Sequence, residues 1–71
     1  MARDICVLLG RRIRELRKRR GWRQIDLAEH AGVNENYVSD LEIGKKEACV
    51  RLLQKIADGL GVSIAKLMDG L

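Results

Sequence analysis

Few side chains of this chain are of the types that perform catalysis or hold a metal. His30 is the single histidine, and no second ligand stands at a spacing that would bind zinc with it. A nucleophile, a base and an orienting group are needed for covalent catalysis, and Ser39, Ser63, Glu35 and Asp40 do not supply such a set around His30. We therefore expect no enzyme activity, no metal and no cofactor.

The two cysteines, Cys6 and Cys49, have neither a CxxC spacing nor a neighbouring histidine. Free thiols in a reducing cytosol fit this pattern better than a disulfide framework, although oxidation of the two to each other stays open. The longest uncharged apolar run, Ile5 to Leu9, is far too short for a membrane span or a secretory signal. The sequence thus predicts a cytoplasmic protein.

Basic side chains are concentrated near the N-terminus. Residues 1–23 carry nine basic and two acidic side chains (+7), whereas residues 24–71 carry five basic and eight acidic ones (−3). Clustered lysine and arginine favour a polyanionic partner. A solvated basic helix face would have the same composition, so charge alone leaves both interpretations open.

Composition and length favour one small helical domain. The chain has 71 residues, no proline, no phenylalanine and two aromatic residues. Few β-branched and aromatic residues beside many Leu, Ala, Arg and Lys predict an all-α fold. A domain of this size has a thin core, for which oligomerisation often compensates.

Apolar residues at helical spacing, glycines and capping residues divide the chain into five expected helices. Asn34 and Ser63 are suitable N-caps, whereas Arg23 and Cys49 are not, so the helices after those two have weak predicted starts. Trp22 is expected to pack at the core edge. The five helices are predicted near residues 4–20, 24–30, 34–43 and 49–59, and briefly after Ser63.

The second and third helices form a pair joined by a glycine turn. Ala28 is small where two helices would cross, Gly32 lies at the turn, and Val38 and Leu41 are apolar three residues apart. The chain here resembles the XRE family, the phage repressor and Cro-type helix-turn-helix regulators, and is similar to restriction-modification controller proteins. The resemblance rests on the stretches RRIRELRKRRGWRQIDLAEHAGV, NENYVSDLEIGKK and VRLLQKIADGLGVSIAKLM.

The resemblance implies a compact five-helix lambda-repressor-like domain with its helix-turn-helix at about residues 24–43, whose second helix enters the major groove of DNA. Asparagine can bridge adenine N6 and N7, so Asn36 is the best base reader, whereas Glu and Asp can only accept, and cytosine N4 is the donor that suits them. The resemblance also implies a structural ion pair between Arg17 and Glu42. The DNA-binding residues it implies are Arg23, Gln24, Asn34, Glu35, Asn36, Tyr37, Ser39, Asp40, Lys45 and Lys46.

We therefore expect a homodimeric regulator, a repressor or autoregulator, that binds a near-palindromic operator without a small-molecule effector. The apolar residues after Ser63 exceed what one short helix needs to bury, so they are expected at the dimer interface, with core contact as the alternative. Because the recognition helix is acidic, an antitoxin or adaptor that binds a basic protein is the alternative function. The expected interface residues are Ile64, Leu67, Met68 and Leu71.

Overall fold

The computed structural model describes residues 4–71, which form five helices and no strand. The helices are α1 (Ile5–Arg19), α2 (Gln24–Ala31), α3 (Glu35–Glu42), α4 (Val50–Leu60) and α5 (Ile64–Leu67). The all-α prediction is confirmed, and each helix lies within a few residues of its expected range. None of the described helices is both long and apolar enough to cross a membrane.

Side-chain caps fix three of the helix starts. The carboxylate of Asp4 accepts from the Cys6 N–H at 2.8 Å, and the amide oxygen of Asn34 accepts from the Asn36 N–H at 2.7 Å. Ser63 Oγ likewise accepts from the Lys66 N–H at 3.0 Å. The predicted caps Asn34 and Ser63 are thus confirmed, and each satisfies a backbone donor that the helix itself leaves free.

The two helices predicted to have weak starts, those after Arg23 and Cys49, do lack a side-chain cap from these residues. Helix α4 starts at Val50 without a side-chain cap. At α2, Asp26 compensates, because its Oδ2 accepts from the Arg23 backbone N–H at 2.8 Å. A carboxylate three residues into a helix supplies this half of a capping box and also favours the positive end of the helix dipole.

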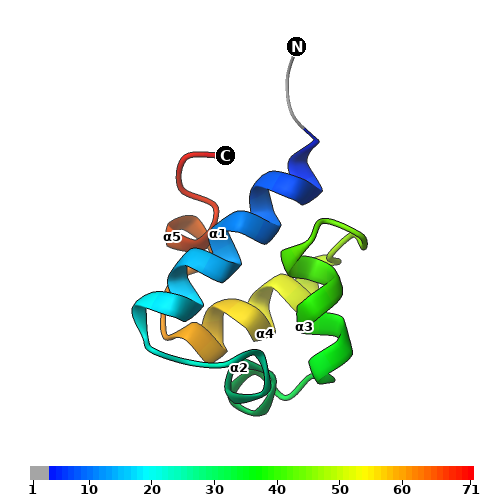
Figure 1. Cartoon of the computed structure of the whole chain (residues 1–71). Coiled ribbons are helices and arrows are strands. Elements are labelled where there is room, and N and C mark those ends of the chain that lie inside the picture. The colour runs from blue at the N-terminus through cyan, green and yellow to red at the C-terminus, as the bar shows by residue number, and fades with distance from the viewer. Residues whose placement is uncertain (1–3) are drawn as a thin grey trace.

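The helices pack around one core, with α2 against α4 and α3, α1 against α3, and α5 against α4 (Figure 1). Gly32 ends α2 in the left-handed region, at φ 70°, which a glycine adopts without strain and which allows the sharp turn into α3. Arg12 on α1 donates to the Lys66 carbonyl of α5 at 3.0 Å. The fully buried side chains at the centre of the core are Ile13, Leu27, Val38, Leu41, Ile56, Leu60 and Leu67.

Candidate nucleic-acid interface

The helix-turn-helix unit exposes the start of α3 and buries its opposite face. Val38 and Leu41 are at most 2% exposed and hold α3 against the core. Glu35 and Asn36, in the first turn, are exposed, whereas Ser39 and Asp40, one turn later, are half-buried. Of the predicted base-reading positions, the first two are therefore the most accessible to a ligand.

Asn34 has a structural role in addition to its predicted DNA contact. Its side-chain oxygen is engaged by the Asn36 N–H in the N-cap of α3. The amide NH₂ of Asn34 is the donor that the cap does not use. Its predicted DNA contact stays a prediction, restricted to that amide group or to the backbone.

The ion pair implied between Arg17 and Glu42 is present and buried. Arg17 Nε lies 2.6 Å from Glu42 Oε2, and its Nη2 lies 2.9 Å from Oε1, so the pair is bidentate. The remaining guanidinium nitrogen, Nη1, donates to the Trp22 carbonyl at 2.6 Å. The pair therefore joins α1, the segment after it and the end of α3 in one hydrogen-bonded unit.

Gln24, the first residue of α2, belongs to the same network. Its Nε2 donates to Glu42 Oε1 at 3.2 Å, and its side chain is partly buried. The second N–H of that amide and its oxygen are not engaged by this bond. Gln24 is thus held at the N-terminus of α2, where the helix dipole favours an anion such as a phosphate.

Arg23, predicted to neutralise a phosphate, is exposed and paired with Asp26. The two groups make guanidinium-to-carboxylate contacts of 3.2 Å, from Nε to Oδ2 and from Nη2 to Oδ1. The hydrogen bond from Arg23 lowers the pKa of Asp26, and the same bond raises the pKa of Arg23. The Arg23 charge is therefore partly compensated within the chain.

The predicted phosphate contacts Lys45 and Lys46 follow α3. The backbone N–H of Lys45 donates to the Asp40 carbonyl at 2.9 Å, and the side chain of Lys46 contacts side chains of α3. Lys46 Nζ lies 3.4 Å from Asp40 Oδ2 and 5.4 Å from the ring centroid of Tyr37. The Tyr37 hydroxyl donates to the Glu47 carbonyl at 3.1 Å, which holds the following loop against α3. Lys45 is exposed. Asp40 thus neutralises Lys46 in this arrangement, a contact that the sequence did not reveal.

Trp22 packs against the core as predicted, and its outer face carries a stack that was not predicted. The rings of Trp22 and His30 are parallel to within 5°, with centroids 4.1 Å apart, and the Arg20 guanidinium carbon lies 5.0 Å from the Trp22 ring. His30 itself is exposed. This stack covers the edge of the core between α1 and α2 and increases the area that the tryptophan buries.

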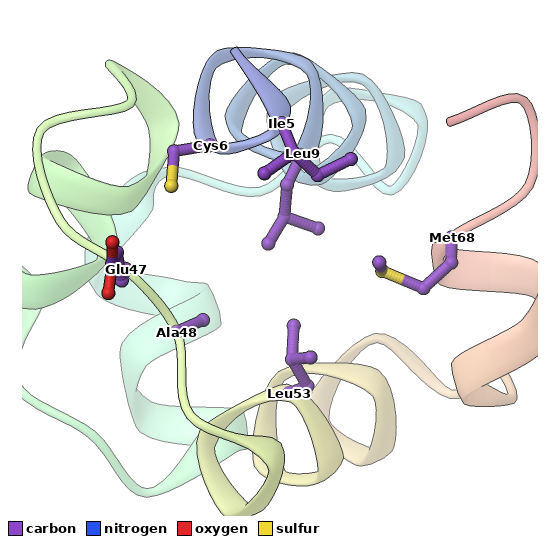
Figure 2. Close-up of a pocket in the computed structure, with 7 residues that line it drawn as sticks. All are labelled: Ile5, Cys6, Leu9, Glu47, Ala48, Leu53 and Met68. Carbon is purple, nitrogen blue, oxygen red and sulfur yellow. The ribbon is translucent and has the colours of Figure 1, made fainter.

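An open apolar pocket of about 270 Å³ lies on another part of the surface, between the start of α1, the loop before α4, and the segment after α5 (Figure 2). Cys6 faces this pocket, and burial, followed by the charges of Asp4 and Glu47, raises the pKa of its thiol. Both cysteines are free thiols, Cys6 half-buried and Cys49 exposed. The lining residues are Ile5, Cys6, Leu9, Glu47, Ala48, Leu53 and Met68.

The four residues expected at a dimer interface divide into two groups. Leu67 has no exposed surface and packs in the core of its own chain, so for this residue the alternative of core contact is correct. Met68 lines the pocket, Ile64 is half-buried, and Leu71 is 37% exposed. Only these three have surface that a second subunit could cover.

Comparison with known proteins agrees with this geometry. The helix-turn-helix family model HTH_3 matches residues 13–67. The transcriptional regulator DdrOP3 of Deinococcus deserti is 39% identical over 62 residues, which cover 87% of this chain and 48% of that protein. SinR of Bacillus subtilis is 35% identical over 63 residues, 87% of this chain and 57% of SinR. The chain thus spans about half the length of these two curated relatives.

Other relatives are matched over most of their length. The control protein C.BamHI of Bacillus amyloliquefaciens is 30% identical over 70 residues, 97% of this chain and 86% of that protein. The restriction-modification controller protein C.AhdI of Aeromonas hydrophila superimposes with a TM-score of 0.85 at 32% identity, over 87% of this chain and 94% of C.AhdI. The chain therefore belongs to the XRE-type helix-turn-helix family of DNA-binding transcriptional regulators.

Proposed function

We propose that this chain is a sequence-specific, DNA-binding transcriptional regulator of the cytoplasm, a repressor or autoregulator, that inserts the first turn of α3 into the major groove. The observation that carries the proposal is the exposure of Glu35 and Asn36 on a helix whose opposite face is buried. Such a helix presents a few side chains to base edges while the preceding helix, α2, lies across the backbone.

Charge distribution supports DNA over a basic protein as the ligand. Two of the three acidic side chains of α3, Asp40 and Glu42, are paired with Lys46 and Arg17. This pairing removes most of the acidic surface that a basic partner would need. The excess of lysine and arginine supplies phosphate contacts, so binding should weaken steeply as salt rises.

We further propose that the protein acts as a homodimer on a near-palindromic operator with half-sites about one helical turn apart. The apolar pocket and three of the exposed large apolar side chains support this proposal. Ile5 lines the pocket and is 52% exposed. The other two are close in the chain to residues that line the pocket: Leu71 follows Met68 by three residues, and Val50, 74% exposed, precedes Leu53 by one turn of α4. A second copy would remove this apolar surface from water.

Replacing Asn36 by alanine should cost about 1–3 kcal/mol of discrimination between operator and random DNA, because the bidentate contact to adenine is lost. Duplexes selected from a random pool at physiological salt give the operator and its symmetry. Equilibrium binding of the wild type and Asn36→Ala to operator and random duplexes then measures the discrimination.

Arg51→Ala is a matched control for Asn36→Ala, because Arg51 is an exposed residue of α4 outside the helix-turn-helix unit. It should leave the ratio of operator to random affinity unchanged. Equal discrimination by the wild type and Asn36→Ala would contradict the assigned base contact. Failure of the wild type to enrich any duplex would contradict DNA recognition itself.

Leu71→Glu should convert the dimer to a monomer, since a charge would be placed in the apolar interface. Leu71 is at the surface, so the fold of the subunit should persist. Sedimentation measures the mass, and Ile43→Glu is the control, because Ile43 is 65% exposed and, unlike Leu71, lies outside the proposed interface. A Leu71→Glu dimer as stable as the wild type would place the interface elsewhere.

A further inference from the structure

The acidic side chains around the recognition helix differ in whether the chain itself neutralises them. Asp26 is paired with Arg23, Asp40 with Lys46, and Glu42 with Arg17. Both carboxylate oxygens of Asp26 and of Glu42 accept hydrogen bonds, and Oδ2 of Asp40 lies 3.4 Å from Lys46 Nζ. The charge of each of these three carboxylates is therefore compensated within the chain, which weakens its attraction for a donor on a base.

Among the carboxylates of α3, Glu35 is the exception. It is exposed, it is the first residue of α3, and within residues 4–71 its carboxylate has neither an ion-pair nor a hydrogen-bond partner. The adjacent Asn36 is exposed too, and its backbone N–H, not its side chain, makes the bond to Asn34. Two unengaged side chains of different chemistry thus stand next to each other at the start of the recognition helix.

The chemistry of a carboxylate restricts which base edge it can contact. An ionised carboxylate can only accept hydrogen bonds, and the donors in the major groove are the amines at cytosine N4 and adenine N6. Adenine also presents the acceptor N7 next to N6, and the lone pair of N7 would repel the second oxygen of the carboxylate. Guanine and thymine present acceptors there, so cytosine is the base that matches Glu35.

We propose that Glu35 reads a cytosine through its N4 amine, beside the adenine read by Asn36, so that each operator half-site carries a cytosine and an adenine at neighbouring positions. The inference rests on the proposed function, since it assumes that α3 enters the major groove. It also gives Asp40 a different role from base reading: Asp40 holds Lys46 against α3.

A carboxylate at the first position of a helix also interacts favourably with the helix dipole. Such a purely structural role would change the stability of α3 when Glu35 is replaced, but it would not change which base is preferred. Base preference is therefore the measurement that separates reading from helix stabilisation. Circular dichroism shows whether α3 and the rest of the fold persist in each variant.

The test selects duplexes from a random pool with the wild type, Glu35→Gln and Glu35→Arg at the same salt concentration. Glutamine bonds adenine N6 and N7, and arginine bonds guanine O6 and N7. At one position of each half-site, we expect cytosine to be replaced by adenine for Glu35→Gln and by guanine for Glu35→Arg. Each variant should prefer its new base by about five-fold or more, the lower end of the range for such contacts.

Glu29→Gln is the matched control, because it makes the same change of charge at an exposed residue of α2. It should alter affinity for all duplexes alike and retain the cytosine. If the wild type enriches a motif and both Glu35 variants enrich the same motif, the inference about Glu35 is wrong and the proposed function stands. If the wild type enriches no motif, both are wrong.

Discussion

Glu42→Ala is expected to lower the free energy of unfolding by about 3–5 kcal/mol, since it leaves the Arg17 guanidinium buried without its partner. The side chain of Arg17 is 10% exposed and that of Glu42 is 3% exposed, so water cannot replace the lost carboxylate. The same substitution removes the acceptor of Gln24. Urea denaturation followed by circular dichroism measures the loss.

The double variant Arg17→Met with Glu42→Leu distinguishes a stranded charge from a general loss of packing. It removes both charges and fills the space with apolar side chains, so much of the stability should return. Arg19→Ala is a surface control, because the Arg19–Glu15 pair is exposed and should contribute less than about 1 kcal/mol. If the free energy of unfolding of Glu42→Ala were within about 1 kcal/mol of the wild-type value, the buried pair would not be what stabilises the packing of α1 against α3.

The helices were predictable because their signals are local in the sequence. Apolar residues at helical spacing, the caps Asn34 and Ser63, and the glycine after each of α2 and α4 fix most of the boundaries. The buried pair Arg17–Glu42 spans 25 positions, and no local rule connects the two residues. Its prediction came from the family resemblance, not from periodicity or charge.

The contacts of the predicted site residues were not predicted from the sequence. The contact of Lys46 depends on how the loop after α3 folds back onto that helix, whereas Arg23 and Asp26 have the local i, i+3 spacing of a helix start. Lys46 reaches back over Tyr37 to Asp40, and Arg23 turns toward Asp26. The sequence showed an acidic recognition helix, whereas in the folded chain Glu35 is the carboxylate of α3 left unpaired among residues 4–71. Pairing within the fold, not composition, decides which charges a ligand meets.

The sequence also could not show which of the apolar residues after Ser63 are buried. The sequence indicated more apolar side chains after Ser63 than a short helix would bury, but it could not divide them between core and surface. In the folded chain Leu67 is fully buried, while Leu71 remains 37% exposed. Leu67 is the buried residue of α5, while Ile64 and Met68 pack against the core and stay partly exposed, a division that depends on the packing of α5 against α4.

Gly10→Ala is expected to lower the free energy of unfolding by about 2–3 kcal/mol and, in addition, to weaken operator binding about tenfold. A Cβ on Gly10 would overlap the Leu41 carbonyl oxygen and would lie 2.6 Å from that of Glu42. Both are backbone atoms at the end of the recognition helix, so no side-chain rotation relieves the overlap. The higher helix propensity of alanine offsets only about 1 kcal/mol of the cost.

The functional effect of Gly10→Ala follows from where α1 and α3 touch. The overlap is relieved when α3 moves away from α1, and such a movement displaces Glu35 and Asn36 at the other end of the helix. Urea denaturation and operator binding, measured well below the unfolding midpoint, separate the two effects. Arg11→Ala, at the exposed neighbouring position, is the control and should change stability by less than about 0.5 kcal/mol. Wild-type stability and affinity in Gly10→Ala would show that α1 and α3 can separate without cost, and that the close approach does not position the recognition helix.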